Sequence, residues 1–179
     1  MKLKIKYEDF VKAYPKKYRS AIFYPSFLKL KNKGLNLRKI KEKLGTKIPK
    51  STIYSWFNGI IPFPFKEFSR IKKEFDRDDL KKLAIIVGHI LGDGGISKKK
   101  FLHYCNTEEF LINEFQNTMN VVFNFDPLYK HKETTGIIRL RYPRLASRIF
   151  LSLFGEFSLG RENKRILPKL RKCQCGGKG

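Results

Sequence analysis

An apolar segment from Leu83 to Ile96, LAIIVGHILGDGGI, restricts the possible folds of this chain more than any other feature. Its first part has the composition of a buried helix, yet Gly88 and Gly92 stand within it. Each glycine inside a helix costs roughly 1 kcal/mol of intrinsic helix stability, and glycines are tolerated there when a second backbone must approach closely. We therefore expect this segment to be a helix that packs tightly against another helix.

A single carboxylate, that of Asp93, ends the apolar helix and has a glycine on each side. If two such helices meet, two carboxylates come together at the end of their contact. A divalent cation relieves the repulsion, and oxygen ligands of this kind suit Mg²⁺, which can activate water and stabilise a phosphodiester transition state. The sequence therefore favours metal-dependent phosphodiester chemistry at Asp93.

The run Ile86-Val-Gly-His-Ile-Leu-Gly-Asp-Gly94 resembles the LAGLIDADG motif of homing endonucleases in its GxxLGDG form. The resemblance puts Gly88 at the packing glycine and Asp93 at the catalytic acid. Leu91 stands where the family has a more variable acid, and His89 is unusual on this face. By the same resemblance, the expected Mg²⁺ ligands are Asp93 and Gly92, and the expected homodimer interface is Val87, Gly88 and Leu91.

The resemblance extends over residues 80–170 in the order of the expected elements. After the motif helix, the patterns predict a strand, a basic turn, a strand over 101–106, a helix, a second hairpin over 128–142 and a last helix that ends near Gly155. In the family, such an αββαββα unit forms a saddle whose strands lie in the DNA major groove. The candidate DNA contacts that follow are Lys98, Lys100, His103, Lys130, Lys132, Arg139 and Arg141. For any one of them, the alternative is a solvated strand face.

Residues 25–59 have the pattern of three short helices. The expected boundaries are Asn36 and Ser51 as N-terminal caps and Gly45 and Gly59 as helix ends. The run 35–59 resembles the helix-turn-helix of transposases, resolvases and small regulators. In such motifs the last helix enters the major groove, which implies DNA contacts at Lys50, Ser51, Thr52 and Ser55. The alternative is an ordinary three-helix packing unit with a basic surface.

The charge balance favours a polyanion as the partner. The chain has 39 Lys and Arg against 16 Asp and Glu, a formal net charge of +23, and the excess is spread along the sequence. No apolar run approaches the ~20 residues of a membrane-spanning helix, and the N-terminus lacks a signal peptide pattern. The expectation is a cytoplasmic protein, nucleoid-associated in a prokaryote when bound to DNA, with neither a membrane nor a small molecule as its partner.

The predicted fold class is α+β, with a small all-α helix-turn-helix domain followed by one αββαββα unit. Residues 1–65 are expected to be helical, 66–79 to form a connecting helix, 80–170 the LAGLIDADG-like unit and 171–179 a disordered tail. The acidic run 76–79 is interpreted as a helix cap at a domain boundary rather than as a metal site.

Two features near the C-terminal end bear on assembly. The run Lys164 to Pro168 resembles the link that leads to a second motif in two-motif family members, and no second unit follows it in this sequence. Cys173 and Cys175 lack a second pair of ligands at the spacing of a zinc site. We therefore expect either a one-motif protein that completes its active site by homodimerisation or an incomplete copy that cannot cut.

Three functions compete on these grounds. The first is a sequence-specific, Mg²⁺-dependent endonuclease for double-stranded DNA that acts as a homodimer. The second is a DNA-binding transcriptional regulator that uses the same fold without catalysis. The third is an RNA-binding or splicing-assisting protein, which fits the charge but not a helix-turn-helix. Retention of Asp93 favours the enzyme, and the single motif favours the regulator.

Overall fold

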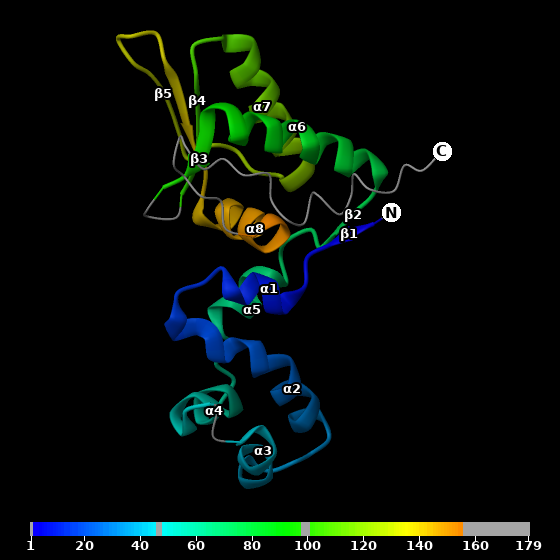
Figure 1. The fold of residues 1–179 in the computed structure, drawn as a ribbon. Helices are drawn as coiled ribbons and strands as arrows, with labels where there is room; N and C mark the ends of the chain where they lie inside the picture. The colour runs from blue at the N-terminus through cyan, green and yellow to red at the C-terminus, as the bar shows by residue number, and fades with distance from the viewer. Residues whose placement is uncertain (1, 46–47, 98–100, 156–179) are drawn as a thin grey trace. The chain divides into compact units, whose positions relative to one another are not determined.

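The structure is a computed structural model that describes residues 2–45, 48–97 and 101–155 (Figure 1). It divides into two compact units, and each is described by itself. Unit 1 takes in residues 1–5 and 72–179 as far as they are described, and unit 2 takes in residues 6–71. The fold class is α+β, as predicted. Among the described helices, none combines the length and the apolar composition needed to cross a lipid bilayer.

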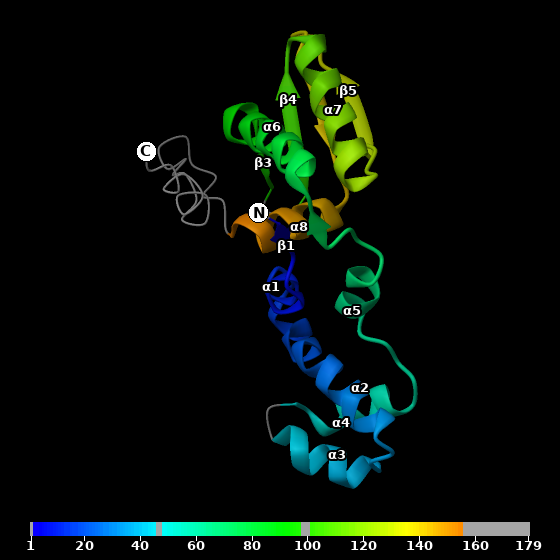
Figure 2. The same cartoon turned by 90° about the vertical axis from the view of Figure 1, so that its right-hand side faces the viewer.

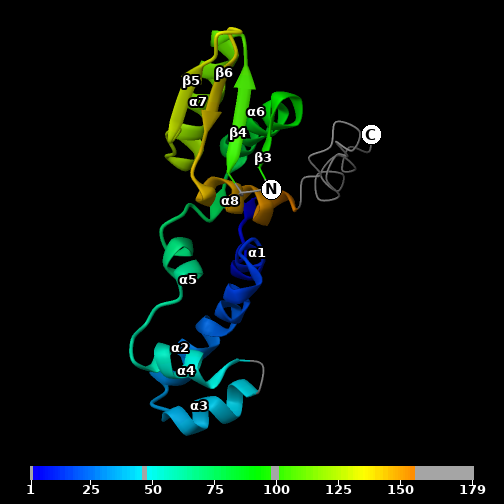
Figure 3. The same ribbon diagram turned by 90° about the vertical axis from the view of Figure 1, so that its left-hand side faces the viewer.

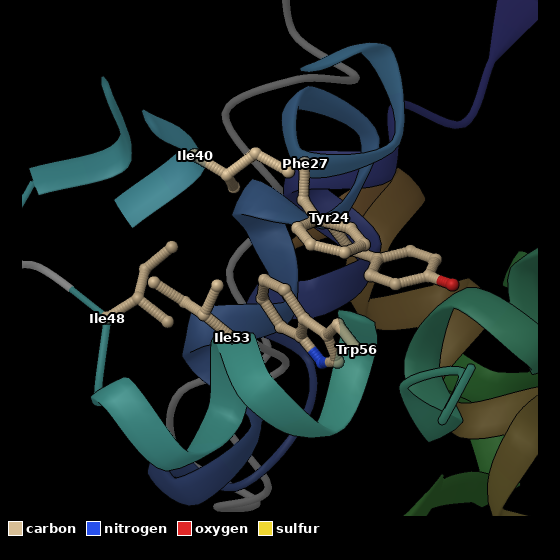
Figure 4. Close-up of a cluster of buried hydrophobic side chains, with 6 residues drawn as sticks. All are labelled: Tyr24, Phe27, Ile40, Ile48, Ile53 and Trp56. Carbon is tan, nitrogen blue, oxygen red and sulfur yellow. The ribbon is translucent and has the colours of Figure 1, made fainter. Parts of the chain in front are cut away.

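Unit 2 is entirely helical. Its elements are α1 (Tyr7–Lys12), the 3-10 helix η1 (Lys16–Phe23), α2 (Tyr24–Asn32), α3 (Leu37–Leu44), α4 (Lys50–Phe57) and α5 (Phe63–Phe68). Side chains from α2, α3, α4 and the turn before α4 meet in one core, shown in Figure 4, which consists of Tyr24, Phe27, Ile40, Ile48, Ile53 and Trp56. The edge of the Trp56 ring faces Tyr24 at a centroid distance of 5.2 Å. This core fixes α4 against the two helices that precede it.

Most of the expected helix boundaries of unit 2 are confirmed. Asn36 caps α3 by accepting a hydrogen bond of 3.0 Å from the backbone nitrogen of Lys39. Gly45 and Gly59 follow their helices with φ values of 68° and 90°, a backbone region that favours glycine. The predicted cap at Ser51 is wrong, because α4 begins one residue earlier at Lys50 and its N-cap is a proline.

A short antiparallel pair of strands in unit 1 changes the predicted division of the chain. β1 (Leu3–Lys4) pairs with β2 (Glu74–Phe75), so the first residues belong to unit 1 and not to the helical region. The connecting helix expected over 66–79 is also wrong: α5 ends at Phe68, a strand follows, and a new helix begins at Arg77. The alternation of Lys and apolar residues at positions 2–6 carried a strand signal that is too short to be specific.

The motif helix, α6 (Arg77–Asp93), begins with a complete capping box. The Asp76 side chain accepts hydrogen bonds from the backbone nitrogens of Asp78 and Asp79, each at 2.9 Å, and the Asp79 side chain accepts one from the Asp76 nitrogen at 3.0 Å. Asp79 also pairs with Lys72 at 2.7 Å, and this hydrogen bond lowers the pKa of its carboxyl. The interpretation of the acidic run as a helix cap is confirmed.

The rest of unit 1 follows α6 in the predicted order. Its elements are β3 (Gly94–Ile96), β4 (Leu102–Asn106), α7 (Glu109–Phe123), β5 (Tyr129–Lys132), β6 (Ile138–Arg141) and α8 (Arg144–Phe154). The four strands form one antiparallel sheet in the order β3-β4-β6-β5. Helices α6 and α7 lie in front of the strands in Figure 2, whereas the opposite view in Figure 3 has β4, β5 and β6 in front of α7. The sheet therefore has one face covered by helices and one face that α6 and α7 leave open.

Candidate nucleic-acid interface and acidic site

The carboxylate of Asp93 lies exposed at the C-terminal end of α6, where the chain turns directly into β3. This turn depends on Gly94. A Cβ atom at position 94 would lie 2.7 Å from the Cα of Ile90 and 3.1 Å from the carbonyl oxygen of His103. The missing side chain lets the end of the helix approach β4 closely, and this approach brings Asp93 within 3.0 Å of the Nδ2 atom of Asn106.

A chain of polar side chains leads from Asp93 into the layer between the helices and the sheet. The Nδ2 atom of Asn106 lies 3.3 Å from the hydroxyl oxygen of Tyr104 and donates to Asp93 as well. The same hydroxyl lies 2.9 Å from Nδ1 of His89, whose Nε2 lies 2.8 Å from a carboxylate oxygen of Glu114. The histidine that the sequence marks as unusual thus faces α7 and β4.

The surroundings of this chain are mostly apolar. The His89 ring lies edge-on to Tyr104 and Phe115, at centroid distances of 5.1 and 5.6 Å. Only 11% of the His89 side chain is exposed, against 38% of Glu114. Burial raises the pKa of the Tyr104 hydroxyl, so Tyr104 stays protonated and can donate a hydrogen bond at neutral pH.

One side of α6 is exposed among the described residues. Ala84, Ile85, Gly88 and Gly92 are exposed and recur at helical spacing, and Ile85 retains 41% of its accessible surface. A Cβ atom at Gly88 or Gly92 would meet no described atom within 4 Å apart from those of its own helix. Of the expected dimer contacts, Gly88 is exposed and Leu91 half-buried.

The third expected dimer contact, Val87, is not available to a partner. It is only 6% exposed and belongs to the core of unit 1. The reason is helical geometry: Val87 follows Leu83 by four residues and precedes Ile90 by three, so all three lie on the inward side. Ala84 and Ile85, which sequence reasoning did not select, lie on the exposed side instead.

The chemistry of the acidic site fits Mg²⁺ in a limited way. Asp93 provides one carboxylate, and the end of a helix carries carbonyl oxygens with a negative partial charge that favours a cation. Mg²⁺ is commonly held by one or two carboxylates and several waters. Among the described residues, no group of three or more His, Cys, Asp or Glu side chains is placed to hold a metal. One chain alone therefore offers Asp93, with the carbonyl of Gly92 beside it.

The open face of the main sheet carries the second group of candidate residues. Residues directly opposite each other on paired strands point to the same face. The register places His103, Arg141 and Tyr129 in one row and Cys105, Arg139 and His131 in the next. Since Leu102, Tyr104, Ile138 and Leu140 are buried on the other face, these two rows form the open face.

Two predicted DNA contacts, Lys130 and Lys132, lie on the opposite face of the sheet from Arg139 and Arg141. Lys130 is paired with Leu140 and Lys132 with Ile138, so both lysines share the face of the buried core and extend past it at the exposed edge strand. The residues of β5 that share the face of Arg139 and Arg141 are Tyr129 and His131, which sequence reasoning missed. The sequence shows that these two residues alternate with the lysines. It does not show which set shares the face of the core, because every residue of β5 is exposed and the strand has no buried apolar residue. Lys98 and Lys100 lie outside the described residues.

The two arginines of the open face differ in their partners. The Nε and Nη2 atoms of Arg139 lie 3.1 and 2.8 Å from one carboxylate oxygen of Glu133, and this hydrogen bonding raises the pKa of Arg139. The guanidinium of Arg141 lies over the rings of Phe101 and Tyr129, at 5.1 and 5.5 Å from their centroids. Beside it, burial lowers the pKa of His103, which is therefore mainly neutral at pH 7.

In unit 2, the predicted contact residues lie on α4. Lys50 and Ser51 are exposed, and Thr52 and Ser55 are half-buried. The Ser55 hydroxyl donates a hydrogen bond of 2.9 Å to the carbonyl of Ser51. Tyr54, which the sequence analysis did not select as a contact, is 57% exposed and is the largest outward side chain of this helix.

The predicted tail over 171–179, with Cys173 and Cys175, and the link from Lys164 to Pro168 lie outside the described residues. No protein-family model, curated protein or solved structure matches this chain. The site itself combines an exposed carboxylate at a helix end with a basic and aromatic sheet face.

Proposed function

We propose that this protein binds double-stranded DNA in a sequence-specific manner and cleaves it with Mg²⁺ as a homodimer, in the way of a LAGLIDADG homing endonuclease. The observation that carries the proposal is the position of Asp93. Its carboxylate is exposed at the end of a helix on which Ala84, Ile85 and Gly88 form an exposed, small and apolar side. Two copies that meet along this side would bring two Asp93 carboxylates together.

The chain's own residues would divide the work as follows. Asp93 and the Gly92 carbonyl would hold Mg²⁺, which when bound can activate water and stabilise the charge that develops on the phosphate. Asn106, through its hydrogen bond of 3.0 Å, would fix the orientation of the Asp93 carboxylate. Tyr104, bonded in turn to His89, would limit the freedom of Asn106.

The open sheet face would be the surface that contacts DNA. His103, Arg139, Arg141 and His131 offer cations or hydrogen-bond donors along two rows, and the formal net charge of +23 adds a long-range attraction to phosphate. The α+β fold supports a saddle-like use of this face. The packing of α2, α3 and α4 supports a helix-turn-helix in unit 2, with Lys50, Ser51 and Thr52 at the DNA.

A second candidate is a DNA-binding transcriptional regulator without catalysis. The observation that favours it is the small number of acids at the site. Asp93 is exposed, but Glu114, at the far end of the polar chain, is already paired with His89. If the chain remains a monomer on DNA, one carboxylate is left where the endonuclease would need two.

Cleavage of a plasmid library that carries random inserts tests the enzyme directly. We expect linear product with Mg²⁺, no product with a chelator, and no product from Asp93→Asn. The matched control is Asp78→Asn, which removes the same charge at the opposite, exposed end of α6. Cleavage by Asp93→Asn at the rate of the wild type would contradict the assigned role of Asp93.

Light scattering with and without duplex DNA tests the assembly. A dimer is expected, and Ile85→Glu should disrupt it because this exposed apolar residue lies on the proposed contact. A protein that binds duplex DNA tightly as a monomer and leaves it uncut would favour the regulator instead.

A further inference from the structure

Arg141 is the one arginine of the open sheet face whose side chain is held by rings and not by a carboxylate. Its guanidinium lies over both Phe101 and Tyr129, and no described carboxylate forms a salt bridge with it. Arg144, at the start of α8, lies over Phe101 at 4.9 Å as well. Contacts with ring faces orient a guanidinium without using its N–H groups as hydrogen-bond donors.

Arg139 is the natural comparison, because it is two residues away on the same strand and points to the same face. Two of its donor atoms are directed at Glu133. To contact a base, Arg139 would have to give up this ion pair. Arg141 would keep its ring contacts and present a free set of donors.

We propose that Arg141 reads a guanine in the DNA that this sheet binds, through paired hydrogen bonds to the O6 and N7 atoms in the major groove. The inference rests on the proposed DNA binding but not on cleavage. Guanine is the base whose major-groove edge offers two acceptors that match the arginine fork. Phe101 and Tyr129 reduce the rotamer freedom that Arg141 must lose on binding, which lowers the cost of the contact.

Arg139 has a different role under this proposal. Its ion pair with Glu133 places its charge near the sheet surface, where it contributes to phosphate attraction without base preference. A bidentate contact between arginine and guanine discriminates against other bases by roughly 5- to 140-fold. A phosphate contact changes the affinity for all sequences alike.

The test is selection of binding sites from a random duplex library, followed by affinity measurements at a fixed salt concentration. The wild type should select a guanine at one position of each half-site. Arg141→Lys, which keeps the charge but loses the fork, should reduce the preference for that guanine at least fivefold. Arg139→Lys, the matched control on the same strand, keeps the charge and should keep the guanine preference, and any change in affinity should be the same for all sequences.

A second variant tests the part played by the rings. Tyr129→Leu keeps an apolar side chain and removes one ring from Arg141, so the guanine preference should weaken while the salt dependence of binding stays as in the wild type. Circular dichroism establishes that each variant is folded.

The results separate this inference from the proposed function. Unchanged guanine preference in Arg141→Lys, or an equal loss in Arg139→Lys, overturns the role of Arg141 and leaves DNA binding intact. Binding without any base preference overturns the role of Arg141 together with the sequence specificity of the proposed function, and leaves only DNA binding as such. A wild type that binds no duplex DNA overturns the proposed function and this inference together.

Discussion

Replacing Gly94 by alanine should destabilise unit 1, whereas the same change at Gly88 should stabilise it. The added Cβ at position 94 would lie 2.7 Å from a backbone carbon of α6 and 3.1 Å from a carbonyl of β4, so backbone must move. Overpacking of this kind costs about 1–3 kcal/mol of folding free energy. Alanine also lowers the conformational entropy of the unfolded chain, which offsets roughly 0.4–1 kcal/mol of that cost. The backbone at Gly94, with φ at −109°, is open to alanine, so the cost is purely steric.

Gly88 provides the opposite case on the same helix. Its Cβ would meet no described atom within 4 Å outside its own helix, so alanine gains helix propensity without a clash. We expect Gly88→Ala to stabilise unit 1 by roughly 0.5–1 kcal/mol. If α6 is the dimer contact, the same change would weaken dimerisation, because a methyl group there keeps two backbones apart.

Each unit can be followed by its own signal during unfolding. Trp56 is the only tryptophan of the chain and is buried in the core of unit 2, so its fluorescence reports on unit 2. Hydrogen exchange of α6 and β4 amides reports on unit 1. We expect Gly94→Ala to lower the protection of these amides and to leave the Trp56 transition unchanged. Wild-type protection in Gly94→Ala would refute the steric argument, and so would a loss of protection in Gly88→Ala at a concentration where wild type and variant are both monomeric.

Three further outcomes follow from single side chains. Tyr104→Phe should lower the free energy of unfolding of unit 1 by about 1–3 kcal/mol in chemical denaturation, because His89 loses a buried hydrogen-bond partner. The control Tyr142→Phe should be nearly neutral, since the buried Tyr142 hydroxyl has no hydrogen-bond partner among the described residues. Equal losses in the two variants would contradict this. Asp79→Asn should lower the free energy of unfolding of unit 1 at pH 7. The difference from the wild type should shrink as pH falls below 3.8, because the stability that comes from the lowered pKa of the wild-type carboxyl is lost as this group becomes protonated. A difference that is constant with pH would count against the ion pair. DNA affinity should rise as pH falls below 6.5, because His103 then becomes charged. In binding titrations at several pH values, His103→Gln should remove part of that rise. An identical pH profile in the variant would exclude His103 as the source of the pH dependence.

Local signals in the sequence predict much of this fold. The helices end where glycine permits a positive φ, as at Gly45 and Gly155, and begin where Asn36 or Asp76 can accept backbone hydrogen bonds. The alternation of Ile138 and Leu140 with Arg139 and Arg141 correctly predicts a strand with one buried and one basic face. These features depend on neighbours within about four residues, and sequence patterns report such neighbours well.

The features that sequence reasoning missed depend on distant partners. The pairing of β1 with β2 joins residues about 70 positions apart, and nothing local specifies it. The face to which Lys130 points is set by its pairing with Leu140, not by its own strand. Asn106 approaches Asp93 because the end of α6 lies close to β4, and Gly94 has no side chain that would keep them apart. An apolar stripe cannot specify such crossings.

Unit 2 is a continuous insertion within the sequence of unit 1, so it can be removed or replaced as one segment. The chain leaves unit 1 after Ile5 and returns at Lys72, and the backbone nitrogen of Ile5 donates a hydrogen bond of 2.9 Å to the carbonyl of Lys73. Because β1 and β2 are paired and antiparallel, a hairpin loop of about two to five residues should be able to replace residues 6–71. A chain in which such a loop replaces unit 2 should therefore keep the β1-β2 pairing and the four-stranded sheet of unit 1.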